Sequence, residues 1–267
     1  MKKPIGVFDS GVGGLTVVKE IMNILPNEDI IYFGDTARVP YGNKSKDIIV
    51  KFSLQISRFL ETKNVKAIVI ACNTASAFAL DAVREKFDIP IIGVISAGAI
   101  AAVRNTKNNK VGIIGTEGTV SSGAYYKKIK AIKEDLEIYS TPCPLFVPIV
   151  EEGWSEKEVS YMIAKEYLEG MKSKNIDTLV MGCTHYPLLN NVVQNVMGDS
   201  VTLINPARET ALELKDILTA NNIENSFEHR GNHKYFVSDN ANKFIKVGEN
   251  FLNQKIEDIS EIDIEKY

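Results

Sequence analysis

Two short stretches constrain the fold more than any other part of the chain. Residues 67–74 read Ala-Ile-Val-Ile-Ala-Cys-Asn-Thr, and residues 178–185 read Thr-Leu-Val-Met-Gly-Cys-Thr-His. Each is an apolar run that stops at a cysteine and then becomes polar. A continuous apolar run is typical of a strand buried on both faces of a parallel sheet, and ligands bind outside the carboxyl ends of such strands. We therefore expect Cys72 and Cys183 to lie at equivalent strand ends, where chemistry is usually done.

The segments around these two stretches repeat in the same order. Four pairs of strand-like segments match at offsets between 106 and 111 residues: 5–10 with 111–116, 30–33 with 137–140, 67–72 with 178–183, and 91–94 with 202–205. Each match is weak alone, but four in order predict two similar α/β units.

The last part of the chain has no counterpart in the repeat. Residues 206–267 predict a helix at 209–220, a strand at 235–237 and a helix at 243–252, and we expect them to return to the first unit.

The predicted fold is therefore α/β with two similar doubly wound parallel-sheet domains. The first domain comprises residues 1–95 and 206–267, and the second comprises residues 96–205. If the two sheets face each other with pseudo-twofold symmetry, the two thiols flank a ligand in the cleft between the domains.

Composition excludes several classes of protein. The 267 residues are 45% hydrophobic and 24% charged, which suits one large or two medium globular domains. The net charge is −3 and no basic stripe occurs, so we expect no nucleic-acid partner. The longest uncharged stretch, residues 89–103, is too short to span a bilayer, and the N-terminus does not resemble a signal peptide. We expect a cytoplasmic protein without a membrane partner.

Cysteine and histidine usage bears on disulfides and metals. Three cysteines without a Cys-x-x-Cys motif argue against a disulfide framework and against a thioredoxin-like site. Cys183 and His185 would need a third protein ligand to hold zinc, so we expect no metal. Cys143, between two prolines, is interpreted as a buried structural cysteine.

Two loops follow early strands and are candidates for ligand contact. The strand at 4–9 ends in Asp9, and residues 10–14 form a glycine turn before a helix at 15–25. The turn does not fit G-x-G-x-x-G, and Asp9 would repel a pyrophosphate, so a small ligand is favoured over a dinucleotide. Residues 35–46, after the strand at 30–34, hold the turn signal Pro40-Tyr41-Gly42.

Two facing thiols suit proton transfer to and from carbon. A thiol has a reference pKa near 8.5, and each cysteine precedes a predicted helix start, which favours negative charge. One thiolate can remove a proton while the opposite thiol returns one to the other face, which inverts a stereocentre without metal or redox cofactor. The same pair could instead form a disulfide or a covalent adduct.

Polar residues beside the thiols fit the same chemistry. Asp9 and His185 can hold or relay a proton, although helix capping and a structural histidine are the alternatives. Further hydrogen-bond donors suited to a substrate carboxylate, or to helix capping, stand at Ser10, Asn73, Thr74 and Thr184. Glu151 and Glu152 follow an apolar segment, where a helix start is the simplest interpretation.

At these residues the sequence resembles the bacterial glutamate racemases of the Asp/Glu racemase superfamily. The matching stretches are Gly-Val-Phe-Asp-Ser-Gly-Val-Gly-Gly-Leu (6–15), Pro-Tyr-Gly (40–42), Ala-Cys-Asn-Thr-Ala-Ser (71–76), Cys-Pro-Leu-Phe-Val-Pro-Ile-Val-Glu (143–151) and Gly-Cys-Thr-His-Tyr-Pro (182–187). No single stretch is specific, but the set in this order is.

The resemblance implies a racemase that interconverts L- and D-glutamate without a cofactor and supplies D-glutamate for peptidoglycan. It implies two α/β domains, usually a homodimer, and Cys72 and Cys183 as the two bases. Asp9, His185 and one acid of the Glu151–Glu152 pair, for which we favour Glu152, would assist. The substrate contacts it implies come from Asp9, Ser10, Tyr41, Gly42, Asn73, Thr74, Thr184, His185 and, with less support, Thr116 and Thr119.

Two alternatives remain open from the sequence. An aspartate racemase, or another two-cysteine racemase, would share the thiols and differ in its side-chain pocket. A regulatory protein that senses an amino acid without turnover would not need paired thiols. No feature of the sequence, such as a basic extension, supports a nucleic-acid or topoisomerase-inhibiting role.

Overall fold

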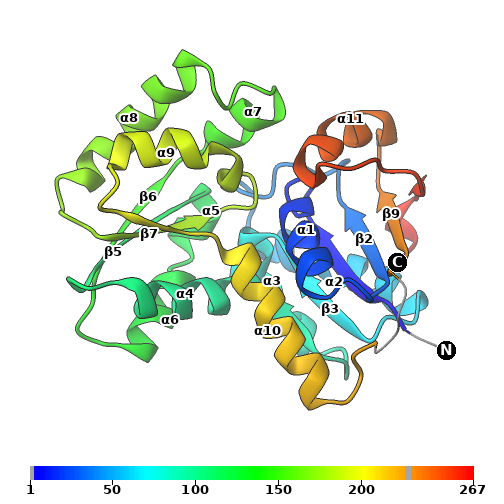
Figure 1. Ribbon diagram of the computed structural model, residues 1–267. Helices are drawn as coiled ribbons and strands as arrows, with labels where there is room; N and C mark the ends of the chain where they lie inside the picture. The colour runs from blue at the N-terminus through cyan, green and yellow to red at the C-terminus, as the bar shows by residue number, and fades with distance from the viewer. Residues whose placement is uncertain (1–2, 226–229) are drawn as a thin grey trace. The chain divides into compact units, whose positions relative to one another are not determined.

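The computed structural model describes residues 3–225 and 230–267 (Figure 1). The chain divides into two compact units, one formed by Met1–Val94 with Ala207–Tyr267 and the other by Ile95–Pro206. Both junctions lie one residue from the boundaries expected from the sequence. The domains expected from the sequence, residues 1–95 with 206–267 and residues 96–205, stay a prediction.

The first unit is built on a six-stranded parallel sheet. Its strands are β1 (Ile5–Asp9), β2 (Ile30–Gly34), β3 (Ala67–Ile70), β4 (Ile91–Gly93), β9 (His233–Val237) and β10 (Ile259–Glu261), in the order β10-β9-β2-β1-β3-β4. The central strands β1, β2 and β3 are buried along their whole length, as expected for strands covered on both faces. The C-terminal strand β9 pairs with β2, so this part of the chain returns to the first unit as expected.

Helices cover both faces of this sheet. They are α1 (Leu15–Ile24), α2 (Lys46–Thr62), α3 (Asn73–Arg84), α10 (Pro206–Ala220), α11 (Ala241–Leu252) and the short 3-10 helix η2 (Ile264–Lys266). Adjacent strand residues point to opposite faces. On β2, Phe33 contacts Phe59 of α2, whereas Tyr32 contacts Phe244 of α11. The sheet is therefore doubly wound.

The second unit repeats the core of the first. Its strands β5 (Lys110–Gly115), β6 (Glu137–Pro142), β7 (Thr178–Gly182) and β8 (Thr202–Ile204) run parallel in the order β6-β5-β7-β8, which corresponds to β2-β1-β3-β4. The register repeats as well: Ile5 pairs with Ala67 in the first sheet, and Val111 pairs with Thr178 in the second. The predicted fold of two similar parallel α/β units is confirmed.

The helices of the second unit are α4 (Val94–Asn105), α5 (Glu117–Ser121), α6 (Ala124–Ile132), α7 (Phe146–Glu151), α8 (Glu158–Lys172), α9 (Asn190–Met197) and the 3-10 helix η1 (Tyr186–Leu189). The long uncharged stretch of the sequence forms β4 and most of α4. Among the described residues, no helix has the length and apolar character needed to cross a membrane.

Each cysteine strand is entered through the same local structure. Asn64 and Asn175 have φ angles of 55° and 56°, and each lies eight residues before its cysteine. Asparagine tolerates this left-handed conformation better than most residues, so it can end the preceding helix and turn the chain into the strand.

Candidate functional site

Cys72 lies just beyond the carboxyl end of β3, at the start of a helix. It is the N-cap residue of α3, its Sγ accepts a hydrogen bond from the Ala75 backbone N–H at 3.5 Å, and its side chain is 6% exposed. The Cys72 thiol also donates a hydrogen bond to Ser10 Oγ at 3.8 Å. The backbone N–H groups and the dipole at the start of a twelve-residue helix favour negative charge at this sulfur position.

Asp9 ends β1, the strand that pairs with β3, and it is fully buried. Its Oδ2 accepts hydrogen bonds from the backbone N–H groups of Gly11, at 3.2 Å, and Gly14, at 3.0 Å. A Cβ at Gly14 would lie 2.5 Å from the Asp9 Cβ, so only glycine fits there. Asp9 therefore orders the glycine turn that precedes α1, and it lies on the strand next to that of Cys72.

The other residues predicted in this unit lie at the same edge of the sheet. Asn73 and Thr74 are buried in the first turn of α3. Tyr41 is buried in the loop after β2 and donates its hydroxyl to Asp35, while Gly42 is half-buried and begins a turn. Burial, followed by the charge of Asp35, raises the pKa of Tyr41 well above its usual value. The Tyr41 hydroxyl therefore keeps its proton at neutral pH and donates it only in a hydrogen bond to Asp35.

Cys183 follows β7 directly, but no α-helix begins there. The Tyr186 N–H donates to the Cys183 carbonyl, and the four-residue helix η1 follows. The Cys183 Sγ lies 3.9 Å from His185 Nδ1, and His185 Nε2 lies 3.1 Å from Glu151 Oε1. The thiol and the imidazole are both nearly inaccessible to solvent. A sulfur, an imidazole and a carboxylate thus form a continuous chain.

The protonation of His185 follows from these contacts. Burial alone lowers the pKa of His185, but hydrogen bonds to Cys183 and Glu151 and the negative charges of both partners raise it to about 10. The imidazole therefore carries a positive charge at neutral pH. An imidazolium next to a sulfur can stabilise a thiolate and can supply or hold a proton.

The structure distinguishes the two neighbouring acids. Glu151 contacts His185 from the end of α7, whereas Glu152, which the sequence favoured, is exposed at the C-cap of that helix. The physical reason is helical geometry: adjacent helix residues point about 100° apart, so only one of the two can face His185. The assisting role itself stays a prediction, now carried by Glu151.

The threonines predicted in this unit lie at the carboxyl edge of its sheet. Thr184 is buried between Cys183 and His185. Thr116 follows β5 as the N-cap of α5, and its Oγ1 lies 3.1 Å from that of Thr119, which is also buried.

Cys143 differs from the other two cysteines. It is fully buried, its thiol donates to the Thr141 carbonyl at 3.7 Å, and burial raises its pKa. Its own carbonyl accepts the Tyr186 hydroxyl at 2.8 Å. Such a thiol is inert, which agrees with the structural interpretation. Within residues 3–225 and 230–267, no cluster of three or more histidine, cysteine or acidic side chains is arranged to hold a metal ion.

Sequence reasoning missed two buried tyrosines that lie near Cys72 and Cys183. Burial raises the pKa of Tyr32, and the charges of Asp9 and Cys72 raise it further; its hydroxyl donates to the Gly11 carbonyl at 2.7 Å. Burial and then the charge of Cys183 likewise raise the pKa of Tyr125. Tyr32 lies in the apolar strand β2, and its hydroxyl, the one side-chain polar group of that strand, was the only feature that could have marked it. Tyr125 follows Ala124 at the start of α6, and no sequence signal marked it.

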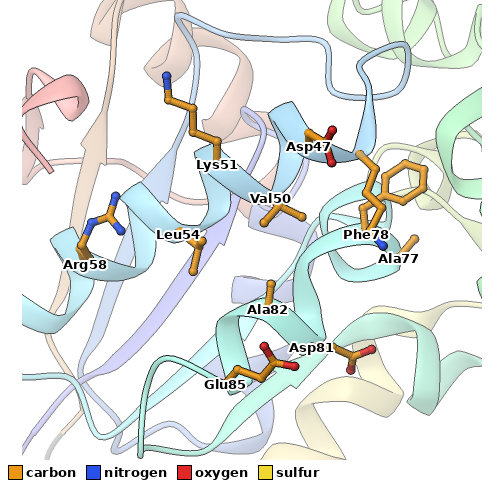
Figure 2. Close-up of a pocket in the computed structure, with 11 residues that line it drawn as sticks. Asp47, Val50, Lys51, Leu54, Arg58, Ala77, Phe78, Asp81, Ala82 and Glu85 are labelled. Atoms are coloured by element: carbon orange, nitrogen blue, oxygen red, sulfur yellow. The ribbon is translucent and has the colours of Figure 1, made fainter.

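A groove on the first unit contains none of the predicted site residues. It has a volume of about 670 Å³ and lies between α2 and α3 (Figure 2). Its lining includes apolar Val50, Leu54 and Phe78, with charged residues of both signs such as Lys51 and Asp81. We do not place the candidate site there, because neither thiol lines it.

Comparison with known proteins agrees with this geometry. The family model described as Asp/Glu/Hydantoin racemase matches residues 5–214. A glutamate racemase from Geobacter metallireducens is 50% identical over 263 residues, covering 98% of this chain and 97% of its own. The chain belongs to the Asp/Glu/hydantoin racemase family, which confirms the resemblance seen in the sequence.

Solved structures show the same relation. Glutamate racemase from Francisella tularensis, in complex with D-glutamate, has a TM-score of 0.94 at 43% identity and covers 100% of this chain and 99% of its own. The Thermus thermophilus enzyme, in complex with beta-chloro-D-alanine, has a TM-score of 0.91 at 42% identity and covers 100% and 99%. An aspartate racemase homologue from Pyrococcus horikoshii, at 20% identity and a TM-score of 0.57, covers 82% of this chain and 100% of its own and shares the fold alone.

Proposed function

We propose that the protein is a glutamate racemase that interconverts L- and D-glutamate with Cys72 and Cys183 as its two bases. The observation that carries this proposal is the equivalence of the two thiols: each follows the strand paired in the same register with the first strand of its unit. Relatives named glutamate racemase, among them one that is 50% identical, support the choice of substrate.

In the proposed reaction, one cysteine acts as a thiolate and the other as a thiol. The thiolate takes the α-proton, and the electrons of the broken C–H bond stay on the α-carbon and spread into the carboxylate. The opposite thiol then gives its proton to the other face and becomes the thiolate. Atoms and charge balance without a cofactor. Cys72 removes the proton of D-glutamate, and Cys183 removes that of L-glutamate.

The neighbouring side chains assist each cysteine differently. His185, protonated and held by Glu151, stabilises the charge at Cys183, and Asp9 with Ser10 orders the surroundings of Cys72. Thr184, Asn73 and Thr74 are buried donors that suit the substrate carboxylates. Tyr41, Gly42 and Thr119 complete the proposed contacts. Thr116, paired with Thr119 by its hydroxyl, has less support.

The wider setting is also part of the proposal. D-Glutamate made by this enzyme supplies peptidoglycan synthesis, for which a cytoplasmic homodimer is expected. An aspartate racemase is the main alternative, because it would use the same thiols with another side-chain pocket.

Incubating the purified protein with L-glutamate, without cofactor, and following optical rotation tests the proposal. Decay of rotation to zero is expected with glutamate and not with L-aspartate or L-alanine. Faster decay with aspartate would favour the alternative. Glutamate binding without any decay would indicate a sensor, and activity lost to a chelator and restored by metal would contradict the mechanism.

A further inference from the structure

The loop after β2 is held by one buried carboxylate. Asp35 is fully buried, and its backbone N–H donates to the Asp9 carbonyl at 3.1 Å. Its carboxylate accepts the Tyr41 hydroxyl, the Ser238 hydroxyl at 2.9 Å, and Arg38 Nε at 2.7 and 3.0 Å. A buried carboxylate is costly unless it is paired and hydrogen-bonded, so the loop conformation depends on these donors.

Arg38 extends this network beyond the loop. Its side chain is 11% exposed and lies over the Phe52 ring, 3.9 Å from the centroid. Its Nη1 donates to Gln55 Oε1 on α2 at 2.7 Å and to Glu265 Oε1 on η2 at 2.9 Å. A single planar guanidinium therefore joins the loop, helix α2 and the C-terminal segment.

The C-terminal segment is itself fixed to α2. Ile264 is buried, the Tyr267 ring meets Phe59 edge-on with centroids 5.3 Å apart, and Arg58 Nε donates to the Tyr267 carbonyl at 2.9 Å. Glu265 Oε2 also accepts from Gln55 Nε2 at 3.3 Å. The carboxylate of Glu265 is thus presented to Arg38 by a docked segment, although its side chain is 59% exposed.

We propose that Arg38 is a positioning residue that holds the substrate loop, and that the C-terminal helix η2 supports it through Glu265. This inference rests on the proposed function, in which Tyr41 and Gly42 contact glutamate. Arg38 fixes Asp35, Asp35 binds the Tyr41 hydroxyl and is tied to Asp9, and the loop is preformed before substrate binds. Lysine cannot replace Arg38, because an ammonium lacks the planar fork that serves Asp35, Gln55 and Glu265 together.

The test is steady-state kinetics of Arg38→Lys and Glu265→Gln with glutamate. Loss of preformed binding raises KM and leaves kcat nearly unchanged. We expect KM to rise about 10-fold in Arg38→Lys and about two- to fivefold in Glu265→Gln, whose ion pair is partly exposed. The matched control is Lys266→Gln, the next residue of η2, whose ammonium pairs with exposed Asp263 at 3.6 Å and which should keep the wild-type KM.

Each outcome decides the inference. The inference is overturned if Arg38→Lys, shown by its melting curve to be folded, has an unchanged KM. It is also overturned if KM rises equally in Glu265→Gln and Lys266→Gln. If Arg38→Lys does not fold, Glu265→Gln against Lys266→Gln decides alone. Because Glu265 acts through Arg38, the double variant should have the KM of Arg38→Lys, and multiplied effects would overturn the role of η2. Wild-type turnover of glutamate tests the proposed function separately.

Discussion

The surroundings of Cys72 and Cys183 differ although their strands are equivalent. Cys72 caps a twelve-residue helix and contacts a backbone N–H and the Ser10 hydroxyl. Cys183 precedes a four-residue 3-10 helix and contacts His185, which Glu151 holds. The Cys72 sulfur lies at fixed backbone dipoles, whereas the Cys183 sulfur contacts a titratable side chain. The repeated sheet therefore fixes where each thiol lies, and the loops fix which groups surround it.

The largest expected effect tests whether both thiols are bases. Cys72→Ser and Cys183→Ser should each lower racemisation on the order of 10³-fold or more, because a serine hydroxyl is a much poorer proton acceptor than a thiolate. Polarimetry with L- and D-glutamate measures this. Cys143→Ser is the matched control, and its effect should be mild, because the buried Cys143 thiol donates to the Thr141 backbone carbonyl. A comparable loss at Cys143 would place a base there.

The second prediction separates the two cysteines. An analogue with a leaving group on its β-carbon can eliminate after one deprotonation, so it needs only one base. Cys72→Ser should still eliminate from the L analogue and fail with the D analogue, and Cys183→Ser should show the reverse. Release of the leaving group, followed for each enantiomer, checks this. Equal loss from both enantiomers in both variants would mean that the thiols act as a unit, and the two-face mechanism should be dropped.

A smaller effect is expected from the carboxylate behind His185. Glu151→Gln removes the negative partner of a buried imidazolium and should slow elimination from the L analogue about 10- to 100-fold, with little change for the D analogue. Elimination rates of the two enantiomers provide the measurement. Glu152→Gln, one residue along the same helix end and exposed, should stay within about twofold of wild type. A larger loss of elimination from the L analogue in Glu152→Gln than in Glu151→Gln would favour Glu152 as the assisting acid.

The sheet core could be predicted because its signals are local and repeated. The four pairs of segments that repeat in the sequence form the four pairs of equivalent strands in the two sheets. The positions of Asp9 and Cys72 follow because their neighbouring strands end at the same edge of the sheet. Strand β10 was missed because three partly exposed residues, Ile259–Glu261, carry no apolar pattern.

The side-chain networks could not be predicted in the same way. The contact between Arg38 and Glu265 joins residues 227 positions apart, and no local pattern encodes such a pairing. The choice between Glu151 and Glu152 depends on the rotation of a six-residue helix, which is finer than the accuracy of a predicted helix boundary. Similarly, the sequence predicted a helix start at both cysteines, but after Cys183 the chain first forms the 3-10 helix η1, and the α-helix α9 begins only at Asn190.

The smallest expected effect concerns stability, and it contrasts a histidine of each unit. The folded pKa of His185 is about 10, above the reference value of about 6.5, because Cys183 and Glu151 outweigh burial. Its contribution to stability is complete below pH 6.5 and is lost as the pH rises towards 10, since only the unfolded chain releases the proton in that range. Burial lowers the pKa of His233, and the charge of Asp29 only partly opposes it. The contribution of His233 is therefore present above pH 6.5 and is lost in acid.

Melting temperatures of wild type, His185→Gln and His233→Gln, measured from pH 5 to 10, test this contrast. The difference in melting temperature between wild type and each variant, plotted against pH, should have opposite slopes for the two histidines. Parallel slopes would mean that His185 is neutral in the folded protein, and the imidazolium assigned to Cys183 would have to be abandoned.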